Sequence, residues 1–359
     1  MLLAFHIPAN ALDVSAASAI VINADTLEII YEKNAHIRRS MASTTKIMTA
    51  LLLCESDTLD EIITCSKNAV TIEGSALGLK AGDKIKGHDL LLGLLLMSGN
   101  DAANVIAEHI SGSNEKFAQK MNEKAREIGL CDTNFVTPSG LDADEHYTTA
   151  YDMALLTAYA LKNTDFADAV SKSTAQIYIN DIRYTIKNHN RLLKSYEGCI
   201  GVKTGFTKKS GRCLVTAAKR DEKTVIAVTL NAPNDWSDHK KLLDFGFDNL
   251  AVKTYSAEGA VISVPVINSN DTCKLTFDDI KVSHIPDNKD KISLNIVKPD
   301  FLFALPENAV VGRVEVLFED KVIASYKLFI KGKILKTEHA EPSLECRFIS
   351  AFLKMLKNF

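Results

Sequence analysis

The chain has 359 residues, 46% of them hydrophobic and 24% charged, which is enough to bury a core and form two or three domains. A net charge of −3, without long runs of lysine or arginine, excludes a typical nucleic-acid-binding protein. The seven cysteines form no CxxC pair and the nine histidines no HExxH motif, so we expect no metal centre and no cofactor.

The first eleven residues, "MLLAFHIPANA", are mostly apolar and end in the small-x-small triplet Ala9-Asn10-Ala11. This triplet is typical of a signal-peptidase site, so residues 1–11 are interpreted as the tail of an export signal. An N-terminal strand is the alternative. Elsewhere the longest apolar run, "LLGLLLM", is too short to span a bilayer.

Residues 18–33 predict a β-hairpin, and residues 43–165 predict one helix after another. Strands return after 175, and a second hairpin turns at Arg220-Asp221-Glu222-Lys223 before a final amphipathic helix. Strands from both ends of this region most economically share one antiparallel sheet. We therefore expect an α+β domain over 12–252, with an antiparallel sheet, covering helices and an all-helical subdomain.

Residues 255–335 change to short β-rich runs with Asn, Asp and Gly turns, which predicts a small all-β domain without an evident chemical site. The segment 343–359 contains "LECRFISAFLKMLKNF", which places its apolar side chains on one helical face and basic ones off it. We expect an amphipathic helix that lies on a membrane surface. Docking of this helix on the β domain is the alternative.

Ser43 and Lys46 form an SxxK pair in "SMASTTKIMTA". On a helix, residues three apart lie on one side, so the amine can reach the hydroxyl and, when neutral, act as its base. SxxK also occurs at Ser113 and Ser237, in polar segments where the lysine is an ordinary solvated residue. Only Lys46 enters an apolar helix, where a buried ammonium is costly unless it is paired or deprotonated.

Two further motifs carry polar groups at corners or strand ends. In "LLLMSGNDAAN", Ser98 and Asn100 lie between two predicted helices, where they either cap a helix or present side chains from a rigid loop. In "GVKTGFT", Lys203, Thr204 and Gly205 end an extended run and offer a fixed positive charge, a hydroxyl and room for a substrate backbone. Lys209-Ser210-Gly211 is a competitor in a predicted turn. For "DEHYTTAYD", around His146, a helix cap is favoured over a metal site.

The order SxxK, SGN and KTG, about 50 and then about 100 residues apart, resembles the serine penicillin-recognising acyl transferases. The strings "EGSALGLKAGD", "LLLMSGNDAANVIAEHISGS" and "FVTPSGLDADEHYTTAYDMALL" are most similar to the low-molecular-mass D-alanyl-D-alanine carboxypeptidases, serine peptidase family S11. The resemblance covers nearly the whole chain and implies a β-lactamase/transpeptidase-like catalytic domain.

The resemblance also implies a role for each side chain. Ser43 is the nucleophile, Lys46 its base and Ser98 the relay of a proton to the leaving D-Ala. Asn100 holds the substrate amide. We predict that Lys46 is substantially neutral, because it is buried and is repelled by the charge of Lys203.

The substrate's carboxylate is assigned by the resemblance to Lys203 and Thr204, and the oxyanion hole to the backbone N–H groups of Ser43 and Phe206. Two departures stand out. Phe206 replaces the family's frequent histidine after Gly205. The segment "NAPNDWSDHKK" lacks the arginine that assists carboxylate recognition in many members, so the anion's partner there stays open.

The implied activity is removal of the terminal D-alanine from peptidoglycan pentapeptides that end in D-Ala-D-Ala, on the outer face of the bacterial membrane, with covalent capture of β-lactams. The alternatives are DD-endopeptidase action on cross-links and a non-catalytic penicillin-binding scaffold. A class A β-lactamase would place a glutamate between the second and third motifs. Glu145 lies in that interval, but its context matches the carboxypeptidases. The nucleophile and base are intact, which speaks against a silent scaffold.

Overall fold

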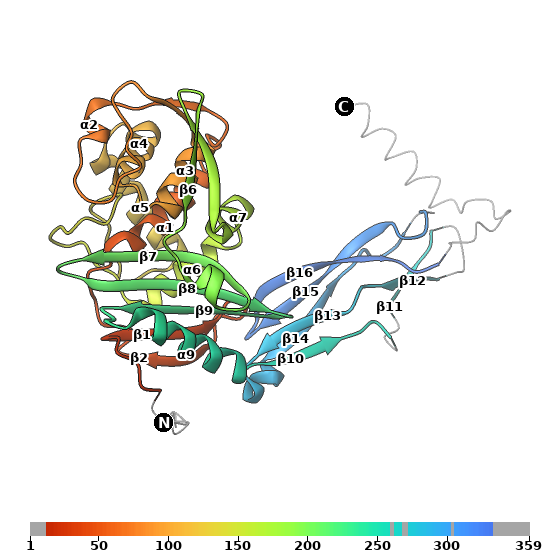
Figure 1. The fold of residues 1–359 in the computed structure, drawn as a ribbon. Coiled ribbons are helices and arrows are strands. Elements are labelled where there is room, and N and C mark those ends of the chain that lie inside the picture. The colour runs from red at the N-terminus through yellow and green to blue at the C-terminus, as the bar shows by residue number, and fades with distance from the viewer. Residues whose placement is uncertain (1–11, 259–261, 268–271, 303–304, 333–359) are drawn as a thin grey trace, which may run out of the picture. The chain divides into compact units, whose positions relative to one another are not determined.

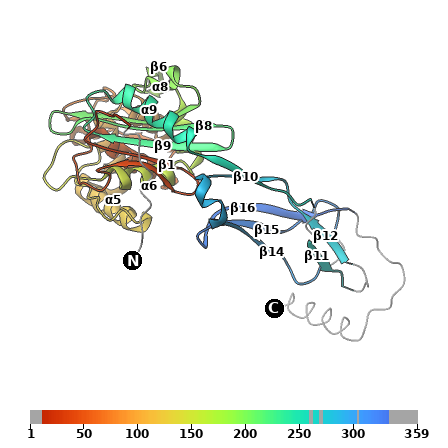
Figure 2. The ribbon, with the colours of Figure 1, turned by 90° about the horizontal axis from the view of Figure 1, so that it is seen from below.

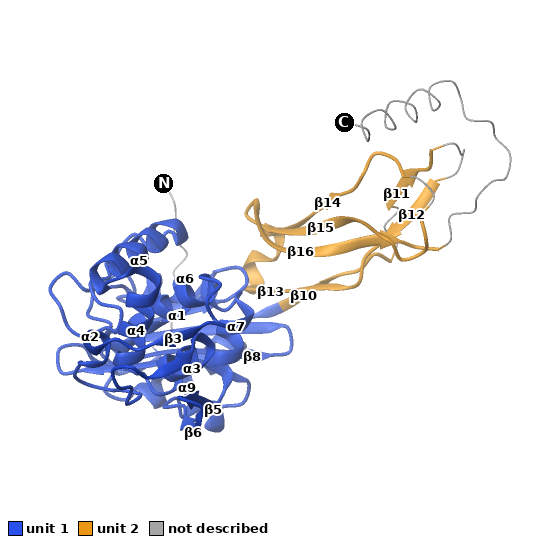
Figure 3. Cartoon of the chain, turned by 90° about the horizontal axis from the view of Figure 1, so that it is seen from above, with its two compact units in different colours: residues 1–251 blue, residues 252–359 orange. Residues whose placement is uncertain are grey.

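The computed structural model describes residues 12–258, 262–267, 272–302 and 305–332. The expected export-signal remnant (1–11) and the amphipathic helix (343–359) lie outside the described residues. The chain divides into two compact units, residues 1–251 and 252–359 (Figure 3). Among the described residues, no helix is long and apolar enough to cross a membrane.

The first unit is built on a five-stranded antiparallel sheet in the order β2-β1-β9-β8-β7 (Figure 1). Strands from both ends of the unit share this sheet, as the sequence predicts. Strand β1, between β2 and β9, is buried along its whole length, which is why its sequence is an apolar run rather than an alternating one. The strands are β1 Ser18–Asn23, β2 Ile29–Lys33, β7 Cys199–Thr207, β8 Gly211–Arg220 and β9 Lys223–Leu230.

Helices cover both faces of this sheet (Figure 2). Helix α9 (Asp235–Asp248) packs on one face, where its buried His239 bonds the hydroxyls of Thr216 and Thr229. The other face supports the main core, to which α1 and α6 contribute. The helices of this larger group are α1 Lys46–Cys54, α3 Gly87–Leu96, α4 Asn100–Ser111, α5 Asn114–Ile128, α6 Ala150–Ala160 and α7 Thr164–Ser171.

The expected all-helical subdomain is wrong in one respect, because it contains a second sheet. Strands β3 (Ile62–Thr64) and β4 (Lys84–Lys86) pair with each other, and β4 then pairs with the hairpin of β5 (Thr174–Ile179) and β6 (Ile182–Lys187). Strands of three residues are too short to show a period of two in the sequence. The short helices are η1 Ala42–Thr45, α2 Lys67–Val70 and α8 Leu192–Ser195.

The second unit contains β-strands with their own apolar core. Strands β11, β12, β16, β15 and β14 form an antiparallel sheet in that order, and β10 pairs with β13. The elements are β10 Ala251–Tyr255, β11 Ile262–Pro265, β12 Thr272–Thr276, β13 Ile280–His284, η2 Pro286–Lys291, β14 Ile292–Val297, β15 Val310–Phe318 and β16 Lys321–Ile330.

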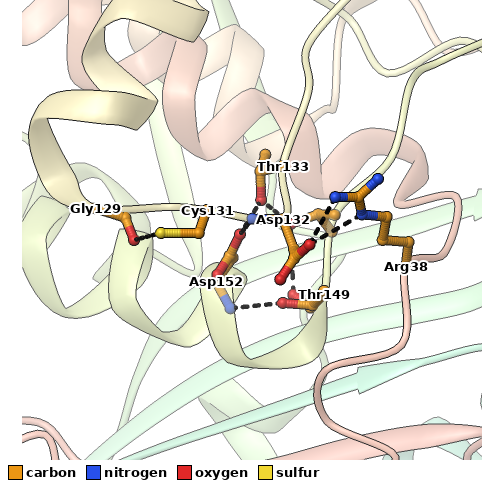
Figure 4. A network of polar contacts seen from close by, with 8 residues as sticks. Arg38, Gly129, Cys131, Asp132, Thr133, Thr149 and Asp152 are labelled. Atoms are coloured by element: carbon orange, nitrogen blue, oxygen red, sulfur yellow. Dashed lines mark hydrogen bonds and ion pairs between the residues drawn. The ribbon is translucent and has the colours of Figure 1, made fainter.

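A network of polar contacts fixes the connection between α5 and α6 (Figure 4). The Asp152 carboxylate accepts from the Asp132 N–H at 2.8 Å and the Thr133 hydroxyl at 2.7 Å, while Thr149 caps α6 by accepting from Asp152 N–H at 3.0 Å. Arg38 pairs with Asp132 at 2.7 Å. The base of the loop between Thr133 and Thr149, whose tip reaches the candidate site, is therefore held in place.

Candidate active site

Ser43 and Lys46 are joined by a hydrogen bond of 3.0 Å between Lys46 Nζ and Ser43 Oγ. Ser43 lies in the 3-10 turn η1, and Lys46 is the first residue of α1, so the tighter turn precedes the helix rather than lying inside it. The Lys46 side chain is 0% exposed. The structure thus places the amine beside the hydroxyl and away from water.

Lys46 has two other acceptors, and both come from distant parts of the chain. Its Nζ donates to Asn100 Oδ1 at 2.7 Å and to the backbone carbonyl of Ser139. Asn100 Nδ2 in turn donates to the Glu73 carbonyl at 2.7 Å. Asn100 therefore orients Lys46. The contact of Asn100 with substrate that the sequence resemblance implies stays a prediction.

Lys203, on β7, is 1% exposed and donates from Nζ to Ser98 Oγ at 3.0 Å and to the Thr204 carbonyl at 2.8 Å. Ser98 lies at the corner between α3 and α4 with a φ of 59°, in the left-handed region that non-glycine residues rarely adopt. The corner therefore aims the hydroxyl at Lys203. The SGN and KTG motifs are thus in contact through Ser98 and Lys203. The SxxK and SGN motifs are in contact through Lys46 and Asn100.

The two buried amines do not behave as ordinary lysines. Burial, followed by the charge of Lys203, holds the pKa of Lys46 well below its usual value, and the negative charge of Asp101 opposes this shift only in part. Burial lowers the pKa of Lys203 to about 7. A buried ammonium loses its hydration and becomes easier to deprotonate. The fixed positive charge expected of Lys203 stays a prediction.

Two backbone N–H groups lie where strand β7 passes η1. A Cβ on Gly205 would be 3.0 Å from Ser43 N, so a larger residue here would push η1 away from β7. The Arg212 carbonyl accepts from Ala232 N, so the backbone N–H and C=O of Arg212 point toward β9. Arg212 and Phe206, which lie opposite each other on β8 and β7, are therefore a non-hydrogen-bonded pair. The Phe206 N–H consequently points outward from the free edge of β7, while its side chain is 64% exposed.

The loop between Thr133 and Thr149 contributes a carbonyl that sequence reasoning missed, that of Ser139. His146 fixes this loop: its Nδ1 accepts from Val136 N at 2.9 Å, and its Nε2 lies 2.9 Å from Thr45 Oγ1, next to Lys46 in the chain. Burial lowers the pKa of His146 to about 4, so the ring is neutral. His146 therefore holds the loop to η1, whereas the expected helix cap is provided by Thr149.

Asp101, in the first turn of α4, clamps a second loop beside the site. Its carboxylate accepts from the N–H groups of Leu77 at 2.8 Å, Gly78 at 2.8 Å and Leu79 at 3.0 Å. Asn100 N also donates to the Ser75 carbonyl at 2.7 Å. Sequence reasoning missed this role, because an aspartate at the start of a helix is expected for the helix dipole alone.

The competing SxxK pairs have ordinary surroundings. Ser113 caps α5 by accepting from Lys116 N, and Lys116 is exposed. Ser237 and Lys240 are both exposed on α9. Over the part of the chain that the structure describes, no cluster of His, Cys, Asp and Glu could hold a metal ion.

We predict that Asp101→Asn loosens the loop that Asp101 clamps. An amide replaces one acceptor oxygen with a donor, which then faces backbone N–H groups, at a cost of about 1–3 kcal/mol. Hydrogen exchange at residues 77–79 should accelerate by at least about tenfold. Asp144→Asn, at an exposed carboxylate, serves as the control. Unchanged exchange at these three amides in Asp101→Asn would contradict the clamp.

Comparison with known proteins identifies relatives of this chain. D-alanyl-D-alanine carboxypeptidase DacF of Bacillus subtilis is 38% identical over 245 residues, which cover 65% of this chain and 62% of that protein. D-alanyl-D-alanine carboxypeptidase DacA of Escherichia coli is 30% identical over 341 residues, covering 89% of this chain and 84% of that protein. The chain thus spans less than two thirds of the first relative and most of the second.

Solved structures are also similar to this chain. Penicillin binding protein 5 from Haemophilus influenzae is similar with a TM-score of 0.65 and 26% identity, over 89% of this chain and 98% of that one. A family model described as D-alanyl-D-alanine carboxypeptidase, peptidase S11, matches residues 6–234, more than half of the chain. The chain therefore belongs to the S11 family of D-alanyl-D-alanine carboxypeptidases.

Proposed function

We propose that this protein is a serine-type D-Ala-D-Ala carboxypeptidase that removes the terminal D-alanine from peptidoglycan stem peptides through an acyl-enzyme on Ser43. The observation that carries the proposal is the contact of 3.0 Å between Lys46 Nζ and Ser43 Oγ, made by an amine that is fully buried and has a depressed pKa. A hydroxyl needs an adjacent base to act as a nucleophile near neutral pH, and neutral Lys46 is that base.

In the acylation step, Ser43 Oγ attacks the carbonyl of the penultimate D-Ala while its proton passes to Lys46. The oxygen of this carbonyl gains negative charge and receives hydrogen bonds from the N–H groups of Ser43 and Phe206. The approach of Gly205 to Ser43 supports this placement, since it brings Ser43 N close to the residue that precedes Phe206. Donors fixed before the reaction need no reorganisation when the charge develops.

Collapse of the intermediate requires a proton on the leaving amine of D-Ala. Ser98 delivers the proton of its own hydroxyl and recovers the one that Lys46 took from Ser43, while Lys203 Nζ, 3.0 Å from Ser98 Oγ, holds the hydroxyl in place. Lys46 is neutral again at the end of this step. It is then available to accept a proton from the water that hydrolyses the acyl-enzyme.

The proposed setting is the extracytoplasmic face of the bacterial membrane, where the enzyme trims pentapeptides during cell-wall maturation and β-lactams acylate Ser43. The export-signal pattern in 1–11 and the amphipathic pattern in 343–359 support this setting from the sequence. The similarity to penicillin binding protein 5 from Haemophilus influenzae supports the β-lactam reaction.

The activity is tested by D-alanine release from a pentapeptide that ends in D-Ala-D-Ala. We expect Ser43→Ala to lose at least about 1000-fold in rate, because it removes the nucleophile. Ser237→Ala, at an exposed SxxK serine, should be unaffected. No release by the wild type, or equal release by Ser43→Ala, would refute the proposal. Parallel digests of monomeric and cross-linked muropeptides separate carboxypeptidase from endopeptidase action.

The pH dependence of penicillin acylation tests the role of Lys203. Only neutral Lys46 accepts the serine proton, so the rate falls as the pH falls through the pKa of Lys46. Lys203→Met removes the repelling charge and raises that pKa, so the acidic limb should move to higher pH. The maximum should also fall, because Ser98 loses its partner. Lys208→Met, at an exposed lysine, is the control. An acidic limb at the wild-type pH would contradict the coupling.

A further inference from the structure

A carboxypeptidase must recognise a terminal carboxylate, and the two amines at this site are poorly suited to provide a permanent cation. The pKa of Lys46 is well below its ordinary value and that of Lys203 is about 7. Lys203 Nζ is also engaged by the Ser98 hydroxyl and the Thr204 carbonyl. A guanidinium would add a cation whose charge is independent of pH, but residues 231–241 contain no arginine.

Arg212 lies on β8, the strand next to β7. It is the second residue of β8 and stands directly opposite Phe206 on β7. The pair is of the non-hydrogen-bonded kind, in which opposite side chains are closest. Opposite residues share a face of the sheet, so the Arg212 side chain lies on the same face as Thr204, diagonally across the two strands. Long side chains span this diagonal of about 7–8 Å.

In the described ranges, the guanidinium of Arg212 has one ionic neighbour, Asp235, which leaves most of its N–H donors free. Its Nη1 is 3.7 Å from Asp235 Oδ2, at the first turn of α9, and its side chain is 53% exposed. Asp235 is itself buried and accepts from Trp236 N at 3.0 Å. Within the described residues the guanidinium makes no other polar contact, so most of its N–H donors remain available.

We propose that Arg212 binds the terminal carboxylate of the substrate, together with the Thr204 hydroxyl, at the free edge of β7. A guanidinium presents paired donors that match a carboxylate, and its charge does not depend on pH in the physiological range. This inference rests on the proposed carboxypeptidase activity. It makes Arg212 the residue that favours a free C-terminus over an amide or a continued chain.

The test compares two tripeptides, diacetyl-lysyl-D-Ala-D-Ala with a free carboxylate and the same peptide with a C-terminal amide. In Arg212→Ala, kcat/KM for the free acid should fall roughly 10- to 100-fold, while kcat/KM for the amide stays unchanged. Arg212→Lys should recover part of the preference, because it keeps the charge without the paired donors.

Arg220→Ala is the matched control. Arg220 lies at the other end of β8 on the same face, about 27 Å away along the strand, and pairs with Asp244 of α9 through Nη2 at 3.6 Å. It repeats the ion pair of Arg212 away from the site. We expect Arg220→Ala to keep the wild-type preference for the free acid.

An unchanged preference in Arg212→Ala, or an equal loss on both peptides, would overturn the proposal. A second readout, the rate of Ser43 acylation by benzylpenicillin against its methyl ester, decides the matter without peptide hydrolysis. If the wild type releases no D-alanine, the proposed function fails. The role of Arg212 is then judged by whether Arg212→Ala abolishes the preference for penicillin over its ester.

Discussion

The burial of the Lys46 amine is the constraint on which the rest of the site depends. Its Nζ is surrounded by the oxygen atoms of Ser43, Asn100 and Ser139, and none of these is a carboxylate. Uncharged acceptors do not compensate for the lost hydration of an ammonium as a carboxylate would. The neutral amine is thereby favoured, and it remains hydrogen-bonded to the serine that it deprotonates in the proposed mechanism.

The surrounding fold supplies these acceptors, and its stability offsets the free-energy cost of burying the two lysines. The α3–α4 corner provides Asn100, and the loop fixed by His146 provides Ser139, while β7 brings a second buried lysine beside Ser98. A pKa of about 7 for Lys203, in place of 10.5, corresponds to several kcal/mol of unfavourable folding free energy at pH 7. The extensive apolar core of the first unit offsets this cost.

Much of this arrangement could be predicted from the sequence, and the failures have physical reasons. The hairpin turning at residues 220–223 is evident because both strands are long, whereas the three-residue strands β3 and β4 show no period. The SxxK spacing identifies Ser43 and Lys46 as a candidate pair. The Ser139 carbonyl has no sequence signal, because every residue has a carbonyl. The burial that lowers the pKa of Lys203 arises from packing between β7 and the α3–α4 corner, which local sequence does not reveal.

The central claim is that Lys46 is neutral in the resting enzyme, and NMR titration of the full chain tests it most directly. Lysine side chains labelled at Cε are followed from acid to alkaline pH, and the Lys46 signal is assigned by its loss in Lys46→Met. The account predicts a resonance that titrates well below 10.5 and shifts upward in pKa in Lys203→Met. A Lys46 signal that titrates near 10.5, like an exposed lysine, would contradict it.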